Sequence, residues 1–519
     1  MGAEAVTHPG VLLVPFPAQG HITPMLRLAR ALAAHGVVAT VAVPDFIHRR
    51  IASAGGGGAG VVALASIPSG IAEDAGGGSD TTPEFGAIVH AMEDHMPPHL
   101  ERMLTSPRRP VACVVVDVLA SWAVPVAARC GVPAAGFWPA MLASYRVVAA
   151  IPELIERGLI SESGTPISSS ESSDDGDEQD GDHSVMRGLK MLPAQVELRA
   201  EELPWLIGDS ATQRSRFDFW LQTLHRARGF RWVLVNSFPG ESGCAAAADD
   251  VDVHRLAMQG PQVLPVGSAL LPGSLSSAAA AERTKHQQQQ QPCVGNNNGD
   301  KNSSMWRADS TCIGWLDAQR AGSVVYVSFG SWVGSIGPDK VRELALGLEA
   351  TGRPFLWALK RDPSWRAGLP EGFAARVAAA GRGKVVDWAP QDDVLRHAAV
   401  GCYLTHCGWN STLEAVRHGV PLLCYPVSGD QFINCAYMTG PWGIGLRLGA
   451  ELRRDDVRGC IGRVMDGGGE GRRLREKVRA LRERVVAAEA RRAADRNVRS
   501  FVDEIRRDRP LLMQIYSVL

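Results

Sequence analysis

Two residues in the first half of the sequence, His21 and Asp117, have the types and positions of a general base and its partner. His21 follows the apolar run GVLLVPF at the start of a stretch with helical periodicity. A helix N-terminus disfavours imidazolium, so this ring would stay neutral and accept a proton near pH 7. Asp117 ends the run VACVVVD, where its carboxylate could hold the other ring nitrogen. Taken alone, a histidine is more often structural than catalytic, and Asp117 could be a helix cap.

A second group of polar residues surrounds a glycine turn in the second half of the chain. The segment GCYLTHCGWNSTLEAVRHG (401–419) reads as a strand, a turn and a helix. This order points a helix N-terminus at any group above the carboxyl edge of the sheet, where free backbone N–H groups bind phosphate. His406 could donate a further hydrogen bond, and Asn410 or Ser411 could cap the helix.

Four further residues could contact a nucleotide sugar, although Glu414 could be an ordinary first-turn glutamate and Asp430 and Gln431 alone would indicate a loop. Glu414 lies one helical turn after Asn410, where it could accept hydrogen bonds from ribose hydroxyls, but the helix dipole alone also favours a glutamate there. Asp430 and Gln431 follow the run VPLLCYP and offer an acceptor and an amide to a polyol. Trp388 ends another apolar run and offers a flat ring for a base to stack on.

No metal ion and no cofactor are expected at this site. Hydrogen bonds to a charged group contribute about 1.5 to 3 kcal/mol each, so three or four contacts reach the ~8 kcal/mol of a micromolar complex. The acidic runs DDGDEQD and DDVD do not end strands, which argues against metal ligation. The ten cysteines are scattered without a CxxC pair and are expected to be reduced and mostly buried.

The elements that must position these residues alternate strand and helix. GVLLVPFP, HITPMLRLARALAAHG and VVATVAVP form strand, helix and strand, the βαβ unit of a parallel, doubly wound sheet. Further apolar runs at 111–117 and 231–238 continue this pattern. We therefore expect an α/β, Rossmann-like domain over residues 1–265.

The alternation restarts in the second half with SVVYVSFGS (323–331) and continues through PFLWALK, GKVVDWAP, GCYLTH and VPLLCYP. Pro338 can open a helix whose buried face carries Val341, Leu344, Ala345 and Leu348. A second Rossmann-like domain is expected over residues 313–490. The Arg/Glu/Ala-rich region from about 470 to 508 is typical of an outer helix with a charged solvent face.

Two stretches interrupt the alternation. Residues 161–184 are rich in Ser, Asp, Glu and Gly with almost no apolar side chains, which predicts a disordered insert in the first domain. Residues 266–312 include poly-Ala, poly-Gln and poly-Asn segments and are expected to form a low-complexity linker between the domains.

Length and composition limit the alternatives. A chain of 519 residues exceeds the roughly 250 to 300 residues of one core, so two domains and a cleft are expected. With 21% charged residues and a formal net charge of -1, nothing predicts binding to nucleic acid or anionic membranes. The N-terminus lacks secretory and myristoylation signals, and no run approaches the ~20 apolar residues of a transmembrane helix. We expect a monomer in the cytosol.

Residues 388–431 closely resemble the 44-residue signature of the plant family 1 UDP-dependent glycosyltransferases. The resemblance runs without a gap and includes WAPQ, HCGWNS, GVP and the final DQ. PFPAQGHITP and VVVDVLASWAVPVA resemble segments from the first domain of the same family, less specifically. The resemblance implies a GT-B fold, in which two Rossmann-like domains with parallel sheets face each other. A last helical segment, here residues 491–519, would cross back to the first domain.

The resemblance also implies a role for each matching residue. Trp388 would stack on uracil and Ala389 would contact the base through its backbone, while Gln391 and Glu414 would bind the ribose. The diphosphate would lie against His406, Gly408, Asn410, Ser411 and the upstream Ser331. Trp409, Asp430 and Gln431 would face the sugar, and a final Gln combined with this Trp is typical of a preference for glucose.

For His21 and Asp117, the resemblance implies a single inverting displacement. His21 would take the proton of an acceptor hydroxyl, whose oxygen would attack the anomeric carbon while UDP leaves toward His406. The substrates would be UDP-glucose and a small lipophilic plant metabolite, and the product a β-glucoside. Trp138, Met141 and the ELPW segment at Trp205 suggest an apolar acceptor pocket without identifying the acceptor.

Other functions remain open from the sequence. A transfer-inactive UDP-sugar-binding protein, or a transferase that uses another hexose, would keep the same donor segment. A nucleotide-sugar epimerase would convert the donor without an acceptor. A dehydrogenase is disfavoured because the GxGxxG match at Gly55, Gly57 and Gly60 lies in a glycine run between strands instead of at a strand-to-helix turn.

Overall fold

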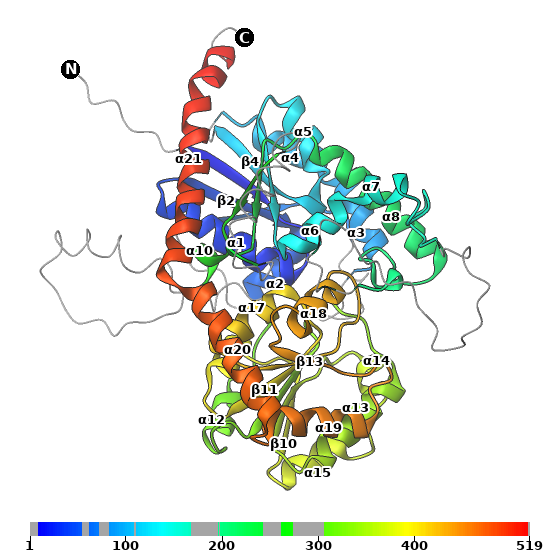
Figure 1. Ribbon diagram of the computed structural model, residues 1–519. Coiled ribbons are helices and arrows are strands. Elements are labelled where there is room, and N and C mark those ends of the chain that lie inside the picture. The colour runs from blue at the N-terminus through cyan, green and yellow to red at the C-terminus, as the bar shows by residue number, and fades with distance from the viewer. Residues whose placement is uncertain are drawn as a thin grey trace, which may run out of the picture.

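The computed structural model describes residues 9–53, 62–71, 83–107, 110–167, 192, 196, 198–241, 261–272 and 306–516, with side chains up to residue 507. Within these ranges the chain forms two halves, each built around a parallel β-sheet, and its last two helices run in succession beside the second half and then the first (Figure 1).

The first half contains a seven-stranded sheet in the order β3-β2-β1-β4-β5-β6-β7, with every neighbouring pair parallel. Its strands are β1 (Gly10–Val14), β2 (Val38–Pro44), β3 (Ala63–Ile67), β4 (Val111–Asp117), β5 (Ala134–Trp138), β6 (Trp232–Val235) and β7 (Gln262–Pro265). Its helices are α1 (Gln19–Ala34), α2 (Asp45–Ser53), α3 (Phe85–His90), α4 (Pro97–Leu104), α5 (Ala123–Arg129), α6 (Leu142–Ala149), α7 (Ile151–Glu156), α8 (Ser210–Ala227) and α10 (Gly267–Leu270).

Both faces of this sheet are buried, which explains why its strands read as continuous apolar runs. In β1, Val11 and Leu13 join one hydrophobic cluster, whereas Leu12 and Val14 join the cluster on the opposite face. A strand buried on both faces has no polar side to expose, as is usual in parallel sheets covered by helices.

The second half contains a six-stranded parallel sheet in the order β10-β9-β8-β11-β12-β13. Its strands are β8 (Val324–Ser328), β9 (Phe355–Ala358), β10 (Gly383–Val386), β11 (Val400–Thr405), β12 (Leu422–Cys424) and β13 (Gly445–Arg447). Its helices are α12 (Thr311–Asp317), α13 (Pro338–Ala350), α14 (Pro363–Arg366), α15 (Phe373–Ala379), α16 (Gln391–Arg396), α17 (Trp409–His418), α18 (Gln431–Thr439), α19 (Arg454–Met465) and α20 (Gly469–Val486). In α13 the four apolar residues predicted to share a face are all buried.

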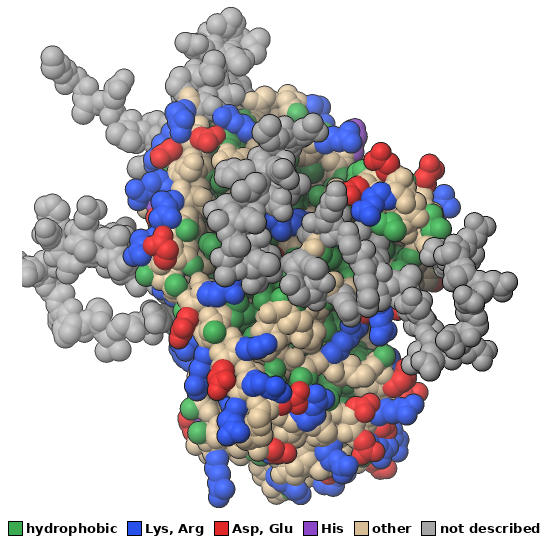
Figure 2. Space-filling model, in the orientation of Figure 1, with side chains coloured by type: hydrophobic (Ala, Val, Ile, Leu, Met, Phe, Trp, Pro, Cys, Tyr) green, Lys and Arg blue, Asp and Glu red, His purple; other side chains and the backbone are tan. Residues whose placement is uncertain are grey.

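The last helix, α21 (Ala488–Tyr516), packs against the first half although it follows the second in sequence (Figure 1). Val498, Phe501 and Val502 are fully buried in the cluster that also contains Val11 and Leu13 of β1. Lys and Arg side chains, with Asp and Glu among them, cover the outer side of this region in Figure 2. The helix begins three residues before the predicted crossing segment, because the chain turns at Ala487 directly after α20.

The predicted insert and linker lie mostly outside the described residues. Of the insert, residues 161–167 are described, and 168–184 lie outside. The backbone N–H of Ser161 donates to the carbonyl of Thr165, and Trp205 Nε1 donates to the carbonyl of Gly164 at 2.8 Å, so this part is held in place. Of the linker, residues 266–272 contain α10 and residues 306–312 contain the start of α12, while 273–305 lie outside.

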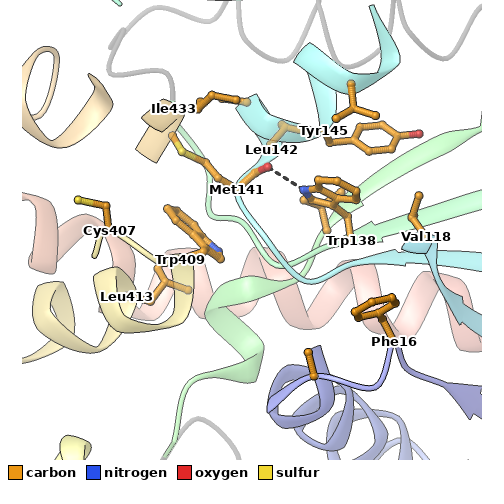
Figure 3. Packing of buried hydrophobic residues seen from close by; sticks show 14 of the residues in the cluster. Phe16, Val118, Trp138, Met141, Leu142, Tyr145, Cys407, Trp409, Leu413 and Ile433 are labelled. Carbon is orange, nitrogen blue, oxygen red and sulfur yellow. Dashed lines mark hydrogen bonds between the residues drawn. The ribbon is translucent and has the colours of Figure 1, made fainter. Parts of the chain in front are cut away.

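The two halves share one hydrophobic cluster across their boundary. Figure 3 shows Trp138 and Met141 from the first half in the same cluster as Trp409 and Ile433 from the second. Trp409 Nε1 donates to the main-chain oxygen of Asn236 at 2.6 Å. Its ring stacks on Phe238, which follows β6, with ring centroids 6.2 Å apart and an interplanar angle of 6°. The halves are therefore joined by buried apolar contacts with directional hydrogen bonds.

Replacing Phe501 by Ala is expected to lower the urea midpoint of unfolding, followed by tryptophan fluorescence. Phe501 is 0% exposed, and its ring packs edge-on against Trp232 at 5.5 Å. Loss of a buried phenylalanine costs about 3 to 5 kcal/mol. The exposed Arg499 of the same helix provides the control, because its replacement by Ala should change stability by less than about 0.5 kcal/mol. Equal effects of the two substitutions would contradict the docking of α21.

Candidate active site

A cavity of about 1190 Å³ lies between the two halves. Residues that follow strands of both sheets line it, among them His21 and Trp138 from the first half and Trp388, His406 and Asp430 from the second. The carboxyl edges of the two sheets therefore face each other. Pockets for one small ligand usually measure about 300 to 1,000 Å³, so this cavity is larger than one small ligand usually requires.

The structure brings the predicted pair His21 and Asp117 together. His21 lies in the first turn of α1, and its Nδ1 is 2.8 Å from Oδ2 of Asp117, which is 0% exposed. The other oxygen, Oδ1, accepts from the backbone N–H of Leu119 at 3.0 Å and caps the short 3-10 helix Val118–Ala120. Asp117 thus serves both as a cap and as the partner of His21. Because a carboxylate can only accept, the hydrogen lies on Nδ1 and Nε2 is left as the acceptor.

His21 lies close to the second half of the molecule. Its ring centroid is 5.2 Å from that of Phe16, which in turn meets Trp332 from the loop after β8 at 6.0 Å. Burial raises the pKa of Asp430, and hydrogen bonding to Asn434 and the nearby His21 oppose that rise. His21 and the carboxylate predicted to bind the sugar therefore share one end of the cavity.

The helix α17 begins at Trp409, with Gly408 as its N-cap residue and no side chain capping it. The prediction that Asn410 or Ser411 caps this helix is therefore wrong, since both lie within its first turn. The preceding residue, Cys407, has a φ of 67°, and this tight turn moves the start of the helix forward. The uncapped N–H groups and the dipole of this helix favour an anion, and residues 408–411 line the cavity.

His406 is held between two glycines. A Cβ added to Gly330, whose φ is 71°, would lie 2.7 Å from the imidazole, and one added to Gly408 would lie 2.4 Å from Nε2. Burial, together with the positive charge of Lys360, lowers the pKa of His406 to about 3. The ring is thus neutral at physiological pH and can donate one hydrogen bond.

The residues predicted to bind ribose form a hydrogen-bonded group. Gln391 Nε2 donates to Ser411 Oγ at 3.0 Å and to Glu414 Oε2 at 2.8 Å. Its Oε1 accepts from the hydroxyls of Tyr326 and Tyr403, both at 3.1 Å, which sets the orientation of the amide. The carboxylate of Glu414 also lies 3.8 Å from Arg27 of α1.

The two residues predicted to bind the base also line the cavity. The ring of Trp388 faces that of Trp306 with centroids 5.6 Å apart and an interplanar angle of 31°, and Ala389 is buried. Ser331 lines the cavity between Gly330 and Trp332. The structure thus gathers the base, ribose and phosphate residues predicted from the sequence at one cavity.

Of the residues predicted to face the sugar, Trp409 lines the cavity but also has a second, structural role. Its indole is 4% exposed and is held against Asn236 and Phe238, so the ring also takes part in the contact between the halves. Asp430 and Gln431 line the cavity as expected. Gln431 Oε1 accepts from two backbone N–H groups of the preceding turn, at Val427 and Ser428, which leaves its amide hydrogens for a ligand.

Asn410 makes an unexpected contact across the cavity. Its Nδ2 donates to the carbonyl of Gly20, the residue before His21, at 2.7 Å. The start of α17 and the start of α1 are thereby linked.

Another part of the cavity lining, from the first half, is largely apolar. Trp138 lies there and donates from Nε1 to the carbonyl of Met141 at 2.9 Å. Met141, which we expected there, is fully buried and does not line the cavity. Of the ELPW segment, Pro204 lines the cavity, whereas Trp205 is held by Gly164. Sequence reasoning missed Phe85, Phe219 and Trp220, which do line it. The aromatic run FDFW at 217–220 was the available signal.

Within the described ranges, the one group of side chains placed to hold a metal ion is formed by Cys407, Cys424 and Cys435. Their sulfur atoms lie within 4.8 Å of one another, and all three residues are buried away from the cavity lining. The eight described cysteines are free thiols, and all except Cys130 are buried. Cys244, Cys293 and both acidic runs lie outside the described residues.

Among the helices that the structure describes, none has the length and the hydropathy required for a membrane span.

Comparisons with known proteins cover both halves of the chain. The family described as UDP-glucoronosyl and UDP-glucosyl transferase matches residues 309–470. UDP-glycosyltransferase 82A1 of Arabidopsis thaliana is 42% identical over 511 residues, which are 96% of this chain and 98% of that protein. The DIMBOA UDP-glucosyltransferase BX8 of Zea mays is 34% identical over 492 residues, covering 91% and 93% of the two chains. The crystal structure of Os79 from O. sativa in complex with UDP has a TM-score of 0.71 at 26% identity and covers 95% of this chain and 100% of that one.

Lowering the pH from 7 to 5 is expected to destabilise the protein less when His406 is replaced by Asn. In the unfolded chain the imidazole takes up a proton as the pH falls through its ordinary pKa of 6.5, whereas buried His406, with a pKa of about 3, does not. The unfolded state is therefore favoured at pH 5 by roughly 2 kcal/mol from this residue.

Urea midpoints at pH 7 and pH 5 measure this difference. A variant with Asn in place of the exposed His225 serves as the control and should keep the pH dependence of the unchanged protein. If the His406→Asn variant loses as much stability as the unchanged protein, the account of a buried neutral ring is wrong.

Proposed function

Because this chain belongs to the plant UDP-glycosyltransferase family, we propose that it transfers glucose from UDP-glucose to a hydroxyl of a small lipophilic acceptor and forms a β-glucoside. The chain is a UDP-glycosyltransferase with the GT-B fold, as its sequence predicted. The identity of the sugar, the class of acceptor and the stereochemistry of the product are the parts proposed here. The cytosolic location and the monomeric state stay predictions.

The observation that carries this proposal is the position of the His21–Asp117 pair. The pair is joined at 2.8 Å, and its His21 lines the same cavity as the uncapped N-terminus of α17, which belongs to the other half. A base on one side and an anion site on the other are the two parts that a displacement at an anomeric carbon requires.

The proposed reaction is a single displacement. His21 Nε2 accepts the proton of the acceptor hydroxyl as its oxygen forms the bond to the anomeric carbon. The bond from that carbon to the UDP oxygen breaks at the opposite side, so an α-linked donor gives a β-linked product. Asp117 stabilises the imidazolium that forms, in the role a carboxylate has in catalytic triads.

The leaving diphosphate would be stabilised without a metal. The first N–H groups of α17 and the neutral ring of His406 offer hydrogen bonds to its oxygens, each contributing about 1.5 to 3 kcal/mol to a charged partner. Glu414 and Gln391, already oriented by their own hydrogen bonds, would bind the ribose, and Trp388 the uracil.

The preference for glucose and for a lipophilic acceptor has separate support. Asp430 and Gln431 line the cavity and offer one carboxylate and one amide to sugar hydroxyls. The similar Zea mays protein is named a glucosyltransferase. Aromatic side chains form the remaining end of the cavity, which suits an apolar acceptor.

Replacing His21 by Ala should lower transfer by roughly 10² to 10⁴-fold, the range for loss of a general base, while UDP binds as before. Replacing His406 by Ala should instead weaken UDP binding by about 10-fold or more, because one hydrogen bond to a charged group is lost. Isothermal titration with UDP and a UDP-release assay separate the two effects. Unchanged turnover in the His21 variant, or an equal loss of affinity in both, would refute this division of roles.

The alternatives predict different results in the same assay. A transfer-inactive binding protein would bind UDP-glucose without releasing UDP for any phenolic or terpenoid acceptor. A transferase for another hexose would release UDP faster from a different donor in a panel of UDP-sugars.

A further inference from the structure

The aromatic end of the cavity contains one half-buried cation, Arg216 of α8. Its guanidinium carbon lies 4.3 Å from the ring centroid of Phe85, so the planar group is held against an aromatic face. Its Nε is buried and has no hydrogen-bond partner among the described residues. Among the residues that the structure describes, no carboxylate forms an ion pair with Arg216.

The other arginine at the buried side of α8 is neutralised. Arg226 donates from both terminal nitrogens to Glu93, at 2.7 and 2.9 Å. Burial lowers the pKa of Arg216, and no nearby charge opposes that effect. A partly desolvated guanidinium without a counter-ion is costly, which makes an anionic ligand a favourable partner.

The remaining arginines that line the cavity belong to its donor end or to the surface. Arg27, Arg396 and Arg417 each face a carboxylate, Glu414, Asp393 and Asp392 respectively. Arg30 has an interaction partner of its own, and Arg307 is exposed. Arg216 is therefore the cation placed to meet a ligand in the apolar end.

A wall of aromatic side chains runs from Arg216 to Trp138 at the end of β5. Phe85 meets Phe219 at 5.4 Å, Phe219 meets Trp220 at 6.4 Å, and Trp220 meets Trp138 at 6.2 Å between ring centroids. All four line the cavity, as does Leu119, whose backbone N–H binds Asp117. An apolar ligand along this wall would occupy the cavity that His21 and Arg216 both line.

We propose that the acceptor is a lipophilic hydroxy acid, bound with its carboxylate on Arg216 and its hydroxyl at His21. A guanidinium offers parallel N–H donors that match the two oxygens of a carboxylate. The ring of Phe85 holds the guanidinium plane and reduces the entropy lost on binding. This inference rests on the proposed function for the hydroxyl end, whereas recognition of the carboxylate rests on Arg216 alone.

A matched pair of acceptors tests this proposal: 4-hydroxycinnamic acid and its methyl ester, which differ in charge and share the phenol. In the presence of saturating UDP, tryptophan fluorescence would follow their binding to the full-length protein. We expect the acid to bind about 10- to 100-fold more tightly than the ester, the effect of a hydrogen-bonded charge pair. In Arg216→Gln this preference should fall below about 3-fold through weaker binding of the acid, while binding of the ester stays the same.

Two further variants make the test specific. Arg214 lies two residues earlier on the exposed side of α8, so Arg214→Gln removes the same charge and should keep the full preference for the acid. Arg216→Lys keeps the charge without the planar fork and should give an intermediate preference for the acid. This variant still tests the proposal if Arg216→Gln does not fold. Equal binding of acid and ester to the unchanged protein, or a preference that survives Arg216→Gln, would overturn the proposal.

Transfer to the same two acceptors separates this inference from the proposed function. If neither compound is glucosylated but the acid is still preferred through Arg216, the proposed function fails and the anion site stands. If both are glucosylated equally well and bound equally well, the proposed function stands and the anion site fails. The product from the acid should be a base-stable glucoside on the hydroxyl, and a base-labile glucose ester would place the carboxylate at His21 and contradict the proposed orientation.

Discussion

The contact of Trp409 with the first half of the molecule determines where everything else in the cleft lies. Its indole donates to Asn236 at the end of β6 and stacks on Phe238. Because Trp409 is also the first residue of α17, the contact that joins the halves also sets the position of the phosphate-binding helix end. Buried aromatic rings remove a large apolar area from water and have few rotatable bonds to fix. They therefore hold the sheet edges in a defined arrangement.

Several polar contacts depend on that arrangement. Asn410, next to Trp409, binds the carbonyl before His21, and Glu414 on the same helix meets Arg27 of α1. The proposed base and donor site are thus positioned by neighbouring residues of the same two helices. Two groups in the cleft also have shifted pKa values, since burial lowers the pKa of His406 to about 3 and raises that of Asp430. Such shifts are characteristic of functional sites.

Much of this arrangement could be predicted because it depends on local pattern. Alternating apolar runs revealed the two parallel sheets, and the rule that strand ends share an edge brought His21 to Asp117. The missed features depend on contacts distant in sequence. Nothing near Trp409 indicates that its partner is Asn236, and nothing near Arg216 indicates Phe85. The prediction of the helix cap was wrong because the start of α17 depends on the backbone of Cys407. That residue has a left-handed backbone conformation, which is rare for residues other than glycine.

The central claim is that a base from one half acts on a sugar held by the other. A crystal structure with a non-transferable UDP-glucose analogue and a bound acceptor tests it most directly. Our account predicts the diphosphate at the start of α17 beside His406, with the acceptor oxygen about 2.6 to 3.2 Å from His21 Nε2 and facing the anomeric carbon. A diphosphate bound elsewhere in the cavity, or an anomeric carbon that faces away from His21, would contradict the account.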